Sequence, residues 1–108
     1  MGLRDDILAL PGTATVWRDV PEWNTRIGIE PLSLPDRLEV GALADKHSDL
    51  VAELLARSIV NEDSIRLFNR IDIDNLGKRW ADVMMDLAQQ ALDLNGWSED
   101  SQQELAGN

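Results

Sequence analysis

The stretch WADVMMDLAQQALDL, residues 80–94, has the clearest structural pattern in this 108-residue chain. Its apolar residues recur at steps of three and one, which places them along one stripe of a helix. The stripe consists of Trp80, Val83, Met84, Leu87, Ala88, Ala91 and Leu94. Asn95 and Gly96 follow directly, and such a pair is typical of a helix C-terminus. The pattern predicts a helix over residues 80–94 whose stripe packs into the core.

A second long helix is predicted upstream, over residues 45–60. Its large apolar side chains also fall on one helical stripe, formed by Leu50, Val51, Leu54, Leu55 and Ile59. Between the two long helices, Asp72 or Asp74 is expected to cap a further short helix that ends near Gly77. The two long helices with their matching stripes predict a helical core.

A shorter helix is predicted to start at Ser33. This residue stands three positions before Asp36, a spacing close to a capping box. Leu34 and Leu38 are expected to face inward from this helix.

Farther along, a short apolar segment is expected to pin a turn into the core, and it contains Ile65, Leu67 and Phe68.

The first thirty residues follow a different period. Residues 3–10 can form a short helix, which Pro11 and Gly12 end. Residues 13–20 are rich in β-branched and aromatic side chains, and residues 25–30 alternate, with Ile27 and Ile29 on one face. These two runs predict a β-hairpin, which must pack on helices because a lone hairpin is only marginally stable in water.

These elements together predict a mainly helical fold of the α+β class. An N-terminal β-hairpin (residues 13–31) packs on a small bundle of about four helices (residues 33–97), followed by a short polar tail (residues 98–108). A length of 108 residues fits a single domain spanning residues 1–108. We expect one hydrophobic core, since 44% of the residues are hydrophobic.

The composition restricts the classes of function. Twenty acidic residues face ten basic ones, and the formal net charge of −10 disfavours binding to nucleic acid or anionic membranes. The chain has no cysteine, which excludes disulfides and thiolate metal sites. The N-terminus carries acids where a secretory signal needs bases, and no window approaches the roughly 20 apolar residues of a membrane span. We expect a cytoplasmic protein.

Candidate catalytic and metal-binding residues are few. His47, the only histidine, lies in a polar stretch without an evident nucleophile, and we expect it to be exposed to solvent. Residues 72–77 resemble the start of a calcium loop, but Leu76 and Val83 stand where oxygen ligands are required. Adjacent Glu62 and Asp63 are expected to form a solvated turn. We therefore predict that the protein is not an enzyme and binds no cofactor.

The aromatic residues point to protein binding. Trp23 lies in the hairpin connection and Trp97 follows the stop signal of the last helix, so both stand at junctions where a side chain can be half exposed. Tryptophan is enriched at binding hot spots. The alternative interpretation is that each tryptophan closes one end of a small core. We predict a partner-binding face around Trp23, Phe68 and Trp97.

Several short motifs follow one another along the chain: VPEW at residues 20–23, LSLPDR at residues 32–37, LF at residues 67–68 and LNGWS at residues 94–98. The order of these motifs resembles that in the tail assembly chaperones of long-tailed bacteriophages. Each motif is short, and the specificity comes from their order along almost the whole chain.

The resemblance implies a function that the residues alone do not. Proteins of this family bind the tape-measure protein, a very long helical chain, and keep it soluble until tail-tube subunits polymerise around it. The implied partners are the tape-measure protein, the tail tube protein and further copies of the chain. The implied location is the cytoplasm of the bacterial host, with the protein absent from the mature virion.

Two other functions remain open. An acidic inhibitor or antitoxin that mimics nucleic acid would account for the net charge, although the acids are spread along the chain without a dense block. A small structural phage protein, such as a head–tail adaptor or tail component, would fit the same family context.

Overall fold

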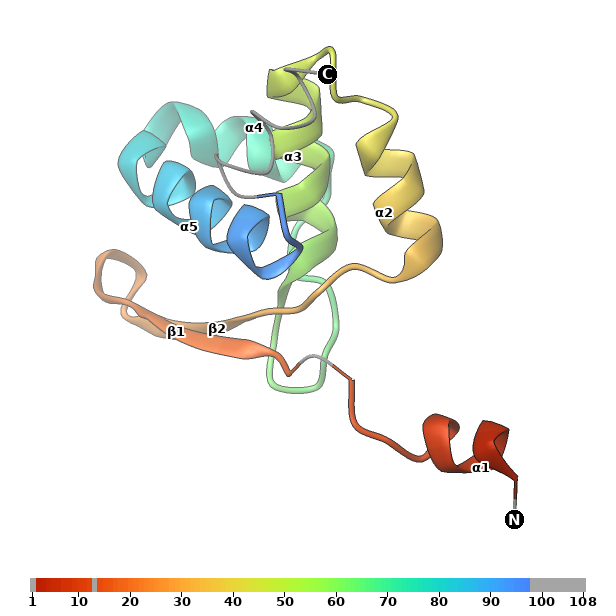
Figure 1. Ribbon diagram of the computed structural model, residues 1–108. Coiled ribbons are helices and arrows are strands. Elements are labelled where there is room, and N and C mark those ends of the chain that lie inside the picture. The colour runs from red at the N-terminus through yellow and green to blue at the C-terminus, as the bar shows by residue number, and fades with distance from the viewer. Residues whose placement is uncertain (1, 13, 98–108) are drawn as a thin grey trace.

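The computed structural model describes residues 2–12 and 14–97 (Figure 1). The predicted polar tail lies outside these residues. Along the chain, the elements are α1 (Leu3–Leu8), β1 (Val16–Val20), β2 (Thr25–Ile29), α2 (Leu34–Gly41), α3 (His47–Ser58), β3 (Ile59–Val60), α4 (Arg70–Arg79) and α5 (Ala81–Leu94). The predicted α+β fold is confirmed: the hairpin lies along one side of a group of four helices, α2 to α5 (Figure 1).

The hairpin is part of a three-stranded antiparallel sheet in the order β1-β2-β3. A 3₁₀ turn over Pro21–Trp23 joins β1 to β2 and ends at Asn24, which adopts a left-handed conformation with φ of 50°. The third strand corrects the predicted helix over residues 45–60, because α3 ends at Ser58. Ile59 is extended instead and pairs with Ile29. Its β-branched side chain suits a strand, and the pairing places it in the core.

The core lies between the inner face of the hairpin and the helices α3 and α5. Leu54 on α3 and Leu87 on α5 are both fully buried, as are Ile27 and Ile29 of β2 at 2% exposure or less. The predicted stripe of α5 is confirmed, since Met84, Leu87, Ala88 and Ala91 are buried and the remaining members are half-buried. The periodicity of each long helix thus identified its buried face.

The residues predicted to face inward from α2 were wrong. Leu34 and Leu38 are 69% and 66% exposed, and Val40 is the buried residue of this helix. The helix starts where predicted, because the Ser33 hydroxyl accepts a hydrogen bond from the Asp36 amide. The side of α2 that carries Val40 therefore faces the core, and the side that carries Leu34 and Leu38 faces outward.

The segment before α4 also differs from the prediction. Ile65 is 60% exposed and does not enter the core, whereas Phe68 is half-buried against it. Neither predicted aspartate is the N-cap of α4, although Asp72 takes part in the cap. Asn69 is the N-cap, and Asp72 completes a reciprocal capping box by accepting from the Asn69 amide. Within the described residues, no helix has the length and apolar character required to cross a bilayer.

Candidate functional site

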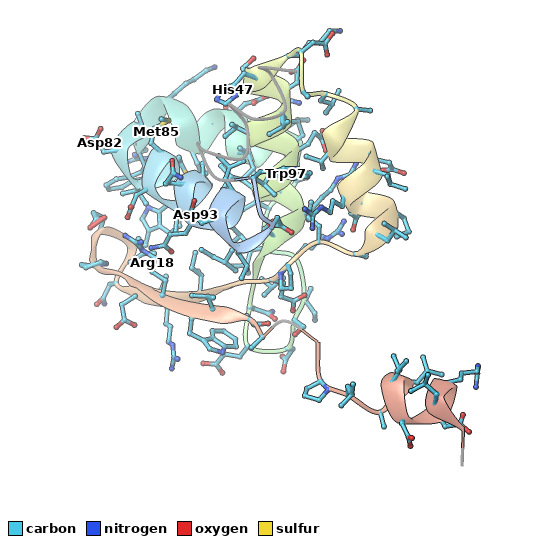
Figure 2. All side chains as sticks on the ribbon, viewed as in Figure 1. Arg18, His47, Asp82, Met85, Asp93 and Trp97 are labelled. Atoms are coloured by element: carbon cyan, nitrogen blue, oxygen red, sulfur yellow. The ribbon has the colours of Figure 1, made fainter. Side chains whose placement is uncertain are left out.

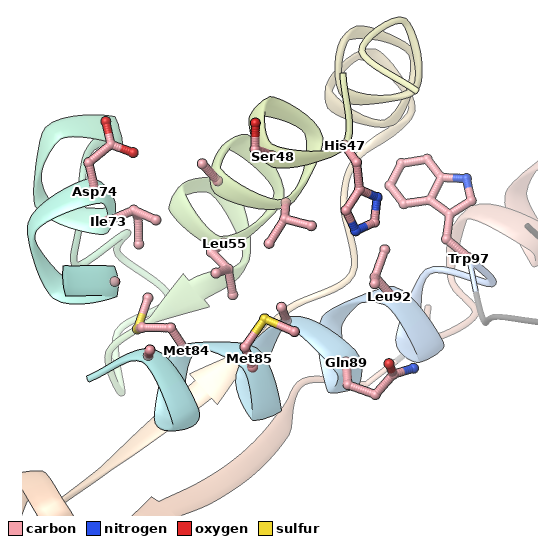
Figure 3. Close-up of a pocket in the computed structure, with 15 residues that line it drawn as sticks. His47, Ser48, Leu55, Ile73, Asp74, Met84, Met85, Gln89, Leu92 and Trp97 are labelled. Carbon is pink, nitrogen blue, oxygen red and sulfur yellow. The ribbon is translucent and has the colours of Figure 1, made fainter. Parts of the chain in front are cut away.

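An apolar groove of about 550 Å³ lies between α3, α4 and α5. Figure 3 shows Met84, Met85 and Leu92 along the α5 side. His47 and Trp97 stand at one end of the groove, and α4 forms the other end (Figure 3). This volume is within the range typical of ligand and peptide sites.

The spacing of residues on α5 creates the groove. Residues 81, 84, 85, 88, 89 and 92 line it, and helical geometry places them on one flank of the helix. Leu55 of α3 and Ile73 of α4 supply the facing walls. The opposite flank of α5 faces the hairpin, where Val83 and Asp86 lie against residues of β1. One helix therefore presents one flank to the sheet and the other to the groove.

The groove offers apolar contact and few polar groups. Its most exposed apolar side chain is Met85, at 69%. Methionine is flexible and polarizable, so a surface that contains it adapts to partners of different shape. Its polar lining comes from His47, Ser48, Asp74 and Gln89, without any Lys or Arg. An apolar groove of this kind suits the stripe of an amphipathic helix.

An ion-pair cluster holds the α4 wall in place. The Arg70 guanidinium bonds to Asp49 of α3 at 2.7 Å and to Asp74 of α4 at 3.2 Å. The hydrogen bond from Arg70 lowers the pKa of the Asp49 carboxyl, and the same bond together with that to Asp74 raises the pKa of Arg70. Asp49 and Arg70 therefore keep their charges near neutral pH, and their ion pair joins α4 to α3.

The three predicted partner-binding residues fall in two places. Trp97 lines the groove, where the Arg37 guanidinium lies 5.3 Å from its ring centroid. Trp23 and Phe68 do not line it. Their rings meet edge to face, with centroids 6.1 Å apart, and both pack against the core. The structure brings Trp23 and Phe68 together and separates them from Trp97.

Met85 and the groove around it were not predicted from the sequence. Met85 stands next to the predicted stripe of α5 and was not assigned to it. A signal was present, because residues 81, 84, 85, 88 and 92 form a second apolar row beside the first. An apolar face wider than a single neighbour can cover indicates a further contact. His47 is exposed, as predicted, although it also stands at the groove.

The described residues contain no cluster of three or more His, Cys, Asp or Glu side chains that could hold a metal ion.

No protein-family model matches the chain, and no curated protein matches it in sequence. A solved structure does match: the tail assembly chaperone of bacteriophage HK97, with a TM-score of 0.59 and 23% sequence identity. The match covers 85% of this chain and 91% of that chain. The two proteins share a fold over most of their length, as the motif order predicted.

Proposed function

We propose that this protein is a bacteriophage tail assembly chaperone that binds the tape-measure protein and keeps it soluble until the tail tube polymerises. The observation that carries the proposal is the fold shared with the HK97 chaperone over 85% of this chain. The order of the sequence motifs supports it independently, since those motifs lie in both the hairpin and the helical part.

The groove is the proposed site for the tape-measure protein. Before assembly, a long helical protein exposes apolar stripes that would otherwise aggregate. A stripe with anchors at i, i+3, i+4 and i+7 fits an apolar groove with helical walls such as α3 and α5. Met84 and Met85 allow one groove to accept successive stripes that differ in shape. Trp97 is the aromatic anchor that we place in this contact.

Trp23 and Phe68 remain candidates for a second contact. Their edge-to-face packing leaves each half-buried, and the Trp23 indole N–H is buried without a partner among the described residues. A contact at this place would extend the binding face along the hairpin. The net charge of −10 would keep complexes apart from one another, because like-charged particles repel.

Co-expression with the tape-measure protein of the same phage tests the proposal. We expect the tape-measure protein to change from insoluble to soluble and to elute from gel filtration together with several copies of this chain. A tape-measure protein that stays insoluble beside folded, soluble chain would refute the proposal. Detection of the chain in purified virions by mass spectrometry would favour a structural tail component instead.

Point variants test the site. Met85→Asp and Trp97→Asp place a charge in the groove and should abolish solubilisation while the far-ultraviolet circular dichroism stays unchanged. Leu34→Asp is the matched control, because Leu34 is as exposed as Met85 but lies outside the groove. If all three variants solubilise the partner equally well, the tape-measure protein binds elsewhere, and Trp23→Asp and Phe68→Asp become the informative variants.

A further inference from the structure

The end of α5 brings the chain to the mouth of the groove. Gly96 has a left-handed conformation with φ of 77°, and the Trp97 amide donates to the Leu92 carbonyl at 2.7 Å. These are features of a motif that ends a helix and reverses the chain. Trp97 is the last residue that the structure describes, and it lines the groove beside His47 (Figure 3). Residues 98–108 therefore begin at the groove itself.

The residues beyond Trp97 are long enough to reach all of the groove. An extended chain advances by at most about 3.6 Å per residue, so Leu105 can lie up to about 29 Å from Trp97. The groove follows α5 from Leu92 to Ala81, which is about 17 Å at the rise of a helix. Leu105 is the single large apolar side chain of residues 98–108. It can therefore meet any of the apolar residues that line the groove.

The charges at the Trp97 end of the groove are complementary to those of residues 98–108. The Arg37 guanidinium lies over the Trp97 ring, and Lys46 directly precedes α3. Neither base forms an ion pair within the described part of the chain. Residues 98–108 carry three acids and no base, and two of these acids stand within three residues of Trp97.

Two acids lie near Lys46 along the chain and leave this balance in place. Asp49 bonds to Arg70 at 2.7 Å, and Asp45 offsets one of the two unpaired positive charges. Helix α3 has no side-chain cap at its N-terminus, so the positive end of its dipole adds to the remaining charge. An acidic segment that starts at this end of the groove is therefore attracted to it.

We propose that residues 98–106 fold back over the groove of their own chain. The first two acids of this segment face the bases at the Trp97 end, and Leu105 packs on Met85, the most exposed apolar residue of the lining. Met85 stands near one end of α5 and Trp97 beyond the other (Figure 2), so the segment runs along the groove. The inference rests on the proposed function in one respect: a tape-measure stripe that enters this groove must displace the segment.

Cross-linking within one molecule tests this contact, because the chain has no cysteine of its own. Ala106→Cys is combined with Gln89→Cys, which lines the groove one turn from Met85, and treated with a short bismaleimide. Asp93→Cys replaces Gln89→Cys in the control, since Asp93 is exposed, lies outside the groove and is closer to Trp97 along α5. Mass spectrometry of the monomer should show about fivefold more cross-link with Gln89→Cys. Equal yields would overturn the proposal, because a segment without a fixed place would reach position 93 at least as readily.

The acids of the segment give a second readout in the same double-cysteine chain. Glu99→Gln together with Asp100→Asn should lower the cross-link to the yield of the control, and raised salt should weaken it in the same direction. Glu62→Gln together with Asp63→Asn removes the same charge outside the groove and should leave the yield unchanged. A yield that is the same in both pairs of substitutions would refute the proposal.

The apolar anchor is tested with the dye 1-anilinonaphthalene-8-sulfonate as the probe of an open groove. Leu105→Asp should raise the fluorescence of the dye about twofold, because the apolar lining is uncovered. Asn108→Asp adds the same charge beyond the anchor and is the control, and Met85→Asp in the Leu105→Asp chain should remove the gain. Equal fluorescence of Leu105→Asp and the wild-type chain would overturn the proposal.

These experiments use no tape-measure protein, so their outcome is separate from that of the co-expression test. A groove that is covered as described, in a chain that fails to solubilise the tape-measure protein, would remove the proposed function and leave the fold-back contact standing. The reverse result, solubilisation with equal cross-linking at positions 89 and 93, would remove the fold-back contact alone.

Discussion

Asn95 fastens the end of α5 to the segment that enters α2. Its side-chain oxygen accepts a hydrogen bond from the Leu32 amide at 2.8 Å, and its side-chain nitrogen donates to the Ala91 carbonyl at 2.8 Å. The residue is only 3% exposed, so water cannot replace either bond. A residue that the sequence indicates only as a helix stop therefore joins two distant parts of the fold.

Asn95→Ala should lower the free energy of unfolding by about 1–3 kcal/mol, because the Leu32 amide loses its acceptor in a buried place. Urea unfolding followed by circular dichroism measures this change. Asn75→Ala, an exposed position on α4, is the control and should change stability by less than about 0.5 kcal/mol. Equal effects of the two substitutions would show that the Asn95 bonds are not structural.

Gly28 allows Trp17 to lie close against β2. A Cβ atom at this position would approach Thr15 Cγ2 to 2.9 Å, Trp17 Cζ3 to 3.0 Å and Val60 Cγ2 to 3.1 Å. The Arg26 guanidinium also lies over the Trp17 ring, 5.2 Å from the ring centroid. The absence of a side chain at Gly28 thus permits the packing of the outer face of the sheet.

Gly28→Ala should destabilise the protein by about 1–3 kcal/mol through overpacking. Gly77→Ala is the contrasting variant, since nothing lies within 4 Å of its Cβ position and alanine favours the helix by up to about 1 kcal/mol. Thermal unfolding of both variants should shift the midpoint in opposite directions. A shift in the same direction would contradict this description of the sheet.

At the scale of elements, α5 has a buried face and an exposed row beside it. Leu87 is fully buried in the core, whereas Met85, two residues away, is 69% exposed. Leu87→Ala should cost about 2–5 kcal/mol, and Leu87→Asp should unfold the protein, because it places a charge in the core. Met85→Ala should leave the midpoint of urea unfolding unchanged. A stable Leu87→Asp variant would mean that this face of α5 is an interface.

A charged cluster joins α2 to α3 and to the segment before α4. Asp36 accepts from Arg57 at 2.9 Å and from Arg66 at 2.5 Å, and Arg57 also bonds to Glu39 at 2.6 Å. Burial alone would raise the pKa of the Asp36 carboxyl. The Arg66 and Arg57 charges and the Ser33 hydroxyl outweigh it, and the pKa lies below its ordinary value of 3.8.

This cluster predicts the direction of the response to acid. Because the folded pKa of Asp36 is lowered, its contribution to stability is present above pH 3.8 and is lost as pH falls through the lower, folded value. Asp36→Asn should cost about 1 kcal/mol at pH 7 and should reduce the loss of stability between about pH 5 and pH 3. Urea titrations at several pH values measure both. An unchanged acid slope in the variant would exclude Asp36 as a source of the effect.

At the scale of the whole molecule, a formal charge of −10 makes copies of the chain repel one another. Salt screens this repulsion, since the Debye length shrinks from about 30 Å at 0.01 M to about 10 Å at 0.1 M. The second virial coefficient from static light scattering should therefore be more positive at about 0.01 M than at about 0.1 M sodium chloride. A second virial coefficient that does not fall as salt is raised would show that net charge does not govern the interaction between copies.

Much of the fold could be predicted because local patterns and tertiary contacts agree. The stripe of α5, the alternation around Ile27 and Ile29, and the cap at Ser33 all have the predicted role. The predictions failed at residues whose conformation or burial depends on packing against distant segments of the chain. Ile59 is apolar and fits a helix or a strand equally well until Ile29 is placed beside it. The sequence fits an inward-facing Leu34, but the residue is 69% exposed because Val40 faces the core from this helix instead.

The candidate site was only partly predictable. Trp97 was selected as a half-buried aromatic residue at a junction, and it does line the groove. Trp23 was predicted on the same ground, and Phe68 came from the apolar segment expected to pin a turn. These two rings pack on each other elsewhere. Distance along the sequence carries no information about which aromatic side chains meet, because that depends on how the hairpin crosses the helices.

The sequence by itself determined the helical and strand segments of the core, the acidic surface and the motif order shared with tail assembly chaperones. These features depend on which side chains follow one another along the chain, and the sequence gives that order directly. The tertiary structure alone decided that α3, α4 and α5 leave an apolar groove, that β3 extends the sheet, and that α1 lies apart from the group of helices. Each of these depends on the relative placement of elements, which arises from packing between residues far apart in the sequence.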